Sequence, residues 1–158
     1  MELQEILGIP ARRLETLSHP AALLLEWYRQ NQREMPWRKT ETFTPTPHQV
    51  WVSEIMLQQT RVEAVRGYYT RFIQQLPDIA ALASAPEDLL LKLWEGLGYY
   101  NRVRNMQKAA QQVMEQYGGA LPADYKALQA LPGIGAYTAG AIASIAFGIP
   151  VPAPDGNV

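Results

Sequence analysis

Residues 131–140 read LPGIGAYTAG, and this stretch decides the expected fold. Its proline fixes one backbone angle, while its first two glycines permit conformations that are closed to other residues. Segments with helical character flank it, at residues 124–131 and 136–147. The pattern therefore predicts two helices joined by a tight hairpin, because proline and glycine interrupt one helix and let the next begin.

The second helix of this hairpin would begin with N–H groups that have no partner inside the helix. Those groups and the positive end of the helix dipole form an anion site, which suits a DNA phosphate without any Lys or Arg. Gly133 and Gly135 would shape the turn that presents them. A plain tight turn is the alternative for a bare Gly-x-Gly, and backbone amides would fix position rather than sequence preference.

The rest of the chain is also expected to be helical. Apolar residues recur at helical spacing between Pro and Gly stops, and no alternating strand pattern or internal repeat is present. The fold class is therefore all-α. The other expected helices span residues 21–35, 50–59, 62–75, 79–83, 86–95 and 101–117.

Composition narrows the class of protein. The 158 residues suffice for one domain with its own core. Because there is no cysteine and the only histidines are His19 and His48, disulfides and thiolate metal sites are excluded and a His-based metal site is not expected. No apolar run could span a bilayer and no signal-peptide pattern opens the chain, so we expect a cytosolic protein with no membrane partner.

The charge distribution bears on how the chain could bind nucleic acid. The net charge is −1, which argues against a strongly basic nucleic-acid binder. Basic residues cluster early, and beyond Lys108 only Lys126 is basic. A last third that touches DNA must therefore use something other than side-chain charge, and the N–H groups of the predicted hairpin offer this.

Residues 50–59, VWVSEIMLQQ, contain a single charge, at Glu54. A carboxyl among so many apolar groups should be partly desolvated, which raises its pKa and lets it serve as a general acid near neutral pH. The alternatives are an exposed Glu on the polar side of the helix, or a buried one paired with an Arg. Gln58, Gln59 and Thr60 favour the functional interpretation, because three uncharged hydrogen-bonding groups at a helix end could read base edges.

A second candidate carboxylate, Asp155, follows the proline-spaced segment 149–154. Gly156 would let the backbone turn, and Asn157 could hydrogen-bond the carboxylate and keep it ionised, although an ordinary Asp-Gly turn is the alternative. With Glu54 it forms a possible acid and anion pair. One group would protonate a leaving nucleobase and the other would stabilise the oxocarbenium charge, as in glycoside hydrolysis.

Four strings carry a family resemblance: MPWR at 35–38, WVSEIMLQQT at 51–60, GLGYY at 96–100, and the hairpin followed by DGNV at 155–158. On these strings, and over nearly the whole chain from about Ala22, the protein resembles the MutY-type adenine DNA glycosylases of the endonuclease III superfamily. The resemblance implies a helical glycosylase core of the six-helix barrel type with a helix-hairpin-helix motif. It also implies base excision repair, with hydrolytic removal of a flipped-out adenine mispaired with 8-oxoguanine or guanine.

The resemblance implies catalytic roles for four matching residues. Glu54 would be the acid that acts at adenine N7, and Asp155, oriented by Asn157, would stabilise or capture the sugar cation. Tyr137 would lie beside Asp155, where strand-cleaving relatives carry a Lys that attacks the sugar. Because a Tyr cannot form a Schiff base, a monofunctional glycosylase is expected.

The resemblance also implies a set of residues that contact DNA and its bases. Tyr99 and Leu97 are candidate wedges or stacking groups on a Gly-flanked loop, with core packing as the alternative, which is favoured for Tyr100. The set comprises Trp37 and Arg38 at the adenine pocket, Gln59 and Thr60 at the lesion and intercalation site, and Leu97 and Tyr99 at the opposite base. Gln58, as a group that could read base edges, and Gly133 and Gly135, at a phosphate, complete the candidates for DNA binding.

The expected organisation has four parts. Residues 1–19 are an N-terminal extension, 20–35 are the first helix on the iron–sulfur side, 36–150 form the barrel with the hairpin at 131–135, and 151–158 form the loop of the catalytic Asp. The family's four-cysteine 4Fe-4S cluster and its 8-oxoguanine-recognising domain would lie beyond Val158, so no cofactor is expected within this chain. The expected partner is duplex DNA containing a mispaired adenine, with a monomeric full-length protein in a bacterial-type cytoplasm, acting at the nucleoid.

Two other readings remain open. One is a non-catalytic helix-hairpin-helix DNA-binding domain, which also describes a fragment made inactive by truncation. The other is a helical protein-interaction module, which would leave the hairpin and the Asp-Gly-Asn string unexplained. Loss of DNA binding on changing Gly133 and Gly135 would separate the two.

Overall fold

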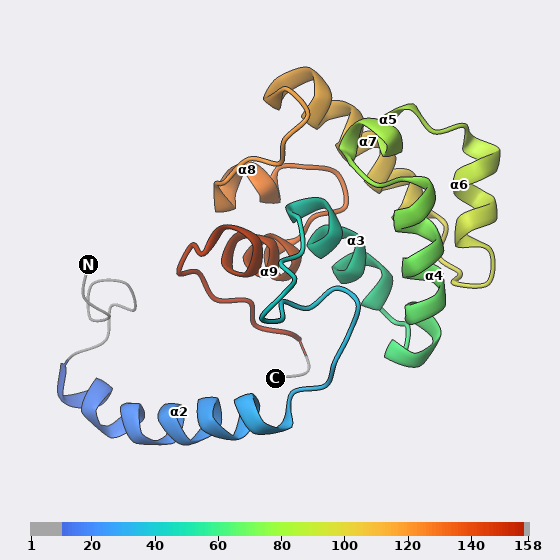
Figure 1. Ribbon diagram of the computed structural model, residues 1–158. Coiled ribbons are helices and arrows are strands. Elements are labelled where there is room, and N and C mark those ends of the chain that lie inside the picture. The colour runs from blue at the N-terminus through green and yellow to red at the C-terminus, as the bar shows by residue number, and fades with distance from the viewer. Residues whose placement is uncertain (1–10, 157–158) are drawn as a thin grey trace. The chain divides into compact units, whose positions relative to one another are not determined.

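A computed structural model describes residues 11–156, with side chains from residue 20 onward, and all of the regular structure in that range is helical. The chain divides into two compact units, residues 1–34 and residues 35–158. Figure 1 traces the helices in chain order. They are α2 (Ala11–Asn31), α3 (Pro47–Leu57), α4 (Val62–Gln75), α5 (Ile79–Ser84), α6 (Glu87–Trp94), α7 (Asn101–Tyr117), α8 (Tyr125–Gln129) and α9 (Ala136–Phe147).

The first unit contains helix α2. It begins at Ala11, earlier than expected from the apolar spacing that starts at Ala21. The helix continues through Pro20, although a proline inside a helix removes one backbone hydrogen bond. The helix of 21 residues therefore runs through the expected boundary near residue 20.

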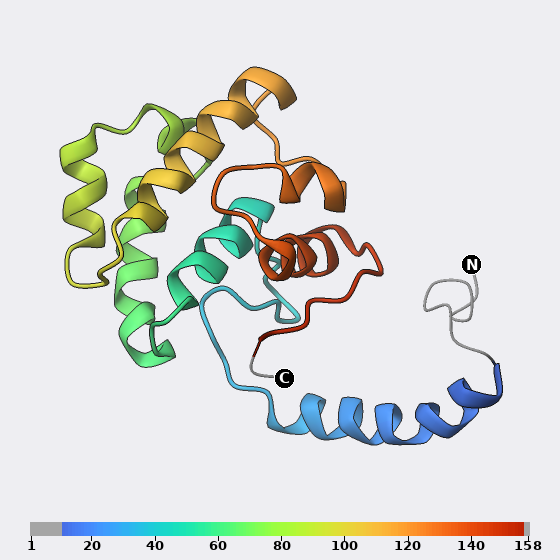
Figure 2. The ribbon, with the colours of Figure 1, turned by 180° about the vertical axis from the view of Figure 1, so that it is seen from behind.

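The second unit is built around α3, which packs against both α9 and α4. Helix α8 covers another side of α9, α6 lies against α4 and α7, and α5 packs along α7. Figures 1 and 2 show α3 and α9 next to each other when the molecule is seen from the front and from behind. The core of this unit includes the fully buried side chains of Trp51, Met56, Phe72 and Trp94.

Helix α3 starts before the expected first residue, 50, and ends before the expected last residue, 59. It begins at Pro47 because Thr46 forms a capping box, in which its hydroxyl accepts from the Gln49 N–H at 3.2 Å and the Gln49 side chain accepts from the Thr46 N–H at 2.8 Å. It ends at Leu57, and Gln59 then adopts a positive φ of 59°. The helix end therefore places Gln58 and Gln59 on a turn.

The other expected helices of this unit agree closely with the structure. Helices α4, α7 and α9 have the expected bounds, and α7 and α9 end at Gly118 and Gly148 in the left-handed conformation. The short helices α5 and α8 are capped by Asp78 and Asp124, whose carboxylates accept from backbone N–H groups at 2.8 Å and 2.7 Å. Among the described residues, no helix is both long and apolar enough to cross a bilayer.

Candidate DNA-binding and catalytic site

Glu54 lies in the middle of α3 with the buried side chains of Ser53 and Ile55 on either side in sequence. Burial raises the pKa of the Glu54 carboxyl above its usual value, while a hydrogen bond donated by the Tyr137 hydroxyl and the positive charge of Arg38 partly oppose this rise. A carboxyl with a raised pKa keeps its proton to a higher pH than an exposed Glu, so it is suited to donate that proton.

Tyr137 connects Glu54 with the second candidate carboxylate. It lies in the first turn of α9, and burial raises the pKa of its phenol, with further increases from Glu54 and then from Asp155. Both carboxyl groups raise the pKa of the same phenol, so Glu54 and Asp155, which are far apart in the sequence, lie near Tyr137. The structure therefore brings together three of the four expected catalytic residues. The fourth, Asn157, lies outside the described residues.

Gly140 positions the segment that carries Asp155. A Cβ at Gly140, which is buried in α9, would lie well under 3.0 Å from the Pro152 carbonyl oxygen and 3.2 Å from the Ala153 Cα. The backbone before Asp155 therefore packs directly on the α9 backbone, and only glycine leaves room for this approach. Asp155 itself is exposed to solvent.

The hairpin joins α8 to α9 through residues 130–135. Gly133 adopts a φ of 74° and a Cβ there would lie 2.9 Å from the Asn105 Cβ, so both conformation and space require glycine. Gly135 has an ordinary φ of −84°, and a Cβ there would meet nothing within 4 Å, which corrects the expectation that both glycines serve an unusual conformation. No side-chain hydrogen bond caps the start of α9, so its first N–H groups could bind an anion.

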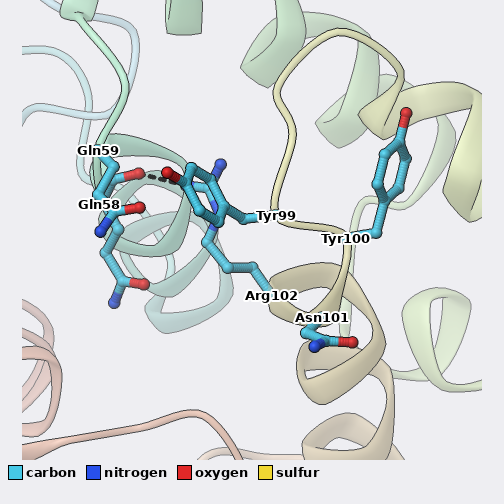
Figure 3. A pocket seen from close by; sticks show the side chains of 6 residues that line it. All are labelled: Gln58, Gln59, Tyr99, Tyr100, Asn101 and Arg102. Carbon is cyan, nitrogen blue, oxygen red and sulfur yellow. Dashed lines mark hydrogen bonds between the residues drawn. The ribbon is translucent and has the colours of Figure 1, made fainter.

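A pocket of about 610 Å³ lies between the end of α3 and the start of α7. Two non-glycine residues with positive φ face it, Gln59 at 59° and Tyr99 at 48°, and such conformations cost about 1–3 kcal/mol each. Figure 3 shows the side chains that line it: Gln58, Gln59, Tyr99, Tyr100, Asn101 and Arg102.

The structure separates the expected base-contacting residues by exposure. Tyr99 is 67% exposed, whereas Leu97 is 7% exposed and belongs to the core, so Tyr99 is the accessible member of that pair. Tyr100, expected in the core, is 37% exposed and points away from Tyr99 (Figure 3). Trp37 is buried, with its ring edge-on to the Tyr69 ring at 5.2 Å, so it could form a wall of a pocket but not an open stacking surface.

The polar residues at the end of α3 also make internal contacts. The Gln58 side chain donates to the Thr138 hydroxyl at 3.3 Å, which joins α3 to the first turn of α9. The Thr60 hydroxyl donates to the Gln58 carbonyl at 3.5 Å. Gln59 alone of the three is exposed.

Three residues that position this site were missed in the sequence: Asn105, Gly140 and Arg102. Each acts by contact with a segment distant in sequence, as when Arg102 donates to carbonyl groups 44 to 47 residues earlier. Gly140 lies inside the quoted hairpin string, and a glycine in an apolar helix is a signal of close packing that could have identified it.

The residues present do not fit an iron–sulfur cluster, because the chain contains no cysteine. Within the described part of the chain, no group of three His, Asp or Glu side chains could hold a metal ion.

The sequence matches the family model described as "HhH-GPD superfamily base excision DNA repair protein" over residues 52–158. That range is more than half of the chain and contains Glu54, the hairpin and Asp155. The chain therefore belongs to the HhH-GPD superfamily of base excision DNA repair proteins, and the expected family and all-α fold class are confirmed.

Curated relatives share a substantial part of the sequence. The adenine DNA glycosylase of Rattus norvegicus is 51% identical over 140 residues, covering 85% of this chain and 27% of the relative. That of Buchnera aphidicola subsp. Baizongia pistaciae is 42% identical over 136 residues, covering 85% of this chain and 38% of the relative. The chain thus spans between 27% and 38% of the length of these two relatives.

Solved structures share the fold. A thermostable thymine-DNA glycosylase aligns with a TM-score of 0.77 at 28% identity, covering 86% of this chain and 61% of that structure. Endonuclease III in a trapped covalent DNA complex aligns with a TM-score of 0.74 at 22% identity, covering 90% of this chain and 64% of that structure, and supports the fold alone.

Proposed function

We propose that the protein is a monofunctional adenine DNA glycosylase, which hydrolyses the N-glycosidic bond of adenine opposite 8-oxoguanine or guanine in duplex DNA. The observation that carries this proposal is the common environment of Glu54, Tyr137 and Asp155 at the start of α9. The identity to adenine DNA glycosylases over most of the chain supports adenine as the target base.

The hairpin is the proposed contact to the DNA backbone. N–H groups at the start of α9 would bind a phosphate, with Gly133 and Gly135 as the turn that presents them. The target adenine would leave the stack, which costs less in a mispair, and would enter a pocket beside Trp37 and Arg38. Gln59 and the exposed ring of Tyr99 would face the base opposite the target, with Gln58, Thr60 and the buried Leu97 supporting them.

In the proposed reaction Glu54 donates its proton to adenine N7. The bond from the sugar C1′ to the base then breaks, and its electron pair leaves with the base. Asp155, held by Asn157, stabilises the positive charge that develops on the sugar, and water adds to C1′ with loss of a proton. Tyr137 has no amine, so we propose no Schiff base and no strand cleavage.

The wider setting is part of the same proposal. The proposed N-terminal extension of residues 1–19 would share helix α2 with the first helix segment at 20–35. The barrel would comprise residues 36–150, and residues 151–158 would form the catalytic loop. A cluster of the family's kind would need ligands beyond Val158, since this chain has no cysteine. The full-length protein would act as a monomer on mispaired DNA in the cytoplasm, at a bacterial-type nucleoid.

A single-turnover excision assay tests this proposal. The substrate is duplex DNA with adenine opposite 8-oxoguanine, and the protein is compared with Glu54→Gln. We expect excision by the parent and a loss of about 10²- to 10⁴-fold in the variant, because the amide cannot donate the acid proton.

Glu115→Gln is the matched control, since Glu115 is exposed on α7 and far in sequence from every proposed site residue. It should excise at the parental rate. A folded parent that binds the duplex but removes no adenine would refute the adenine assignment and leave a non-catalytic DNA-binding domain.

A further inference from the structure

The pocket at the end of α3 depends on two turns from different parts of the chain. Gln59 lies on the turn after α3, and Tyr99 lies on the turn before α7. Each holds a positive φ that a side-chain-bearing residue adopts only when its surroundings enforce it. Contacts from elsewhere in the fold must therefore hold both turns in place, because the residues next to each turn in sequence do not connect one turn with the other.

Arg102 in the first turn of α7 makes that connection. Its Nη1 donates to the carbonyl oxygens of Ile55 at 2.9 Å and Met56 at 3.3 Å, and to that of Gln58. Its Nη2 donates to the carbonyl oxygens of Leu97 at 3.1 Å and Gly98 at 3.3 Å. One guanidinium thus joins the last turn of α3 to the turn before Tyr99.

The planarity of the guanidinium matters for this arrangement. Two nitrogens at a fixed angle reach two separate sets of carbonyl groups, which the single ammonium of a lysine cannot do. The positive charge also suits the end of α3, where backbone carbonyls lack helical partners. The guanidinium carbon lies 5.2 Å from the Trp94 ring centroid and 5.7 Å from the Tyr99 ring centroid, so the same group also contacts the exposed ring.

Figure 3 shows the result. The Arg102 side chain extends from α7 toward Gln58, with the Tyr99 ring beside it, while Tyr100 points elsewhere. Arg102 therefore contacts the backbone on both sides of the pocket, at residues next to Gln59 and next to Tyr99.

We infer that Arg102 is a positioning residue for base discrimination: it holds Gln59 and Tyr99 in one arrangement, so that the preference for 8-oxoguanine over guanine opposite adenine depends on its two-sided contacts with backbone carbonyls. This rests on the proposed function, in which Gln59 and Tyr99 face the opposite base. Displacement of either group by about 1 Å is enough to change a rate strongly.

The test compares Arg102→Lys with Arg104→Lys. The control is on the same helix, and Arg104 forms an exposed ion pair with Glu87 at 3.3 Å. The first readout is amide hydrogen exchange at Gln58 and Leu97, whose N–H groups donate to Ile55 and Trp94. The second is the ratio of single-turnover rates with 8-oxoguanine and with guanine opposite adenine.

For Arg102→Lys we expect exchange at both amides to rise together, with exchange unchanged at Ala139, whose N–H donates to Gly135. We expect the rate ratio to fall by about tenfold or more. Arg104→Lys should leave both readouts at parental values, because an exposed ion pair contributes little.

Unchanged exchange at either amide would overturn the inference, and so would raised exchange with an intact rate ratio. A parent that excises no adenine from either duplex would instead overturn the proposed function. In that case the exchange readout still decides whether Arg102 couples the two turns.

Discussion

Two regions beside the first turn of α9 are built in different ways. The hairpin at residues 131–135 offers backbone N–H groups, and its shape follows mainly from a short local sequence, with Asn105 of α7 packed close to Gly133. The acid site needs side chains from three segments: Glu54 on α3, Tyr137 on α9 and Asp155 on the terminal loop. The hairpin is thus a local structure that acts through backbone groups, whereas the acid site is a tertiary arrangement that acts through side chains. Changes in the hairpin should therefore alter DNA affinity, and changes in the acid site should alter the rate of bond cleavage.

Of the substitutions that test this contrast, Gly140→Ala is expected to have the largest effect, which is on the excision rate. The new Cβ would collide with the Pro152 carbonyl, so the segment before Asp155 must move away from α9. We expect the single-turnover rate at saturating protein to fall by about 10²-fold, because a displacement near 1 Å suffices for this, while the DNA dissociation constant stays near parental.

Gly67→Ala is the control for that change. Gly67 is also inside a helix, and a Cβ there would meet only the end of the Arg71 side chain at an ordinary 3.5 Å. It should keep the parental rate. Equal rates for the two variants would contradict the docking of the Asp155 segment on Gly140.

Gly133→Ala should produce the opposite pattern. The positive φ and the approach to Asn105 both oppose a side chain, so the hairpin must distort and its N–H groups lose their alignment. We expect the dissociation constant for duplex DNA to rise about tenfold, as for loss of a charge-assisted hydrogen bond, with little change in the rate at saturation.

Gly118→Ala provides the comparison, since Gly118 has a similar φ of 64° at the end of α7 but open space around it. The Gly118→Ala protein should be less stable than the parent but should bind duplex DNA with the parental dissociation constant. A loss of affinity of the same size in both variants would show that strain alone, and not the hairpin, accounts for the effect.

A smaller effect concerns the pH profile of excision. Because burial raises the pKa of Glu54, the protonated acid should persist to higher pH than an ordinary Glu, and the rate should fall only as pH rises through that raised pKa. The Tyr137 hydrogen bond lowers this pKa, so Tyr137→Phe should move the falling limb to higher pH. Tyr100→Phe should leave it in place, and a shift of the Tyr137→Phe limb to lower pH would contradict the assignment.

The smallest effect concerns stability. A Glu whose pKa is raised in the folded state binds its proton more tightly there than in the unfolded state. The contribution of Glu54 to the free energy of unfolding should thus be fully present below the unfolded pKa and be lost as pH rises through the folded pKa. Urea titrations across this range should show a shallower decline for Glu54→Gln, and parallel curves for the two proteins would argue that Glu54 is well solvated.

The same contrast explains what the sequence could predict. The bounds of α7 and α9 follow from periodicity and a terminal glycine, which are local signals. The start of α3 differs from the expected one because the capping box of Thr46 and Gln49 begins the helix before its apolar spacing starts at Val50. The desolvation of Glu54 was predictable from its apolar neighbours, and burial does raise the pKa of its carboxyl, while its role as the acid stays a prediction.

The positioning contacts were not predictable in this way. Arg102 binds carbonyl groups, which every residue possesses, so the identities of its partners give no signal in the sequence. The burial of Leu97 beside the exposed Tyr99 depends on the path of the turn after Gly96, where the Tyr68 hydroxyl occupies the space that a side chain would need. Such features arise only when distant segments meet.

The contact between Gly140 and the Pro152 carbonyl also has a genetic consequence. Every single-nucleotide missense change in a glycine codon introduces a residue with a Cβ, and it is this first carbon that meets the backbone. Even the smallest replacement at codon 140, alanine, should therefore impair the protein, and a bulky side chain is not needed for the effect. Inherited or laboratory variants there would look alike in a functional screen, and a conservative-looking alanine would be misjudged as harmless by any scale based on side-chain similarity.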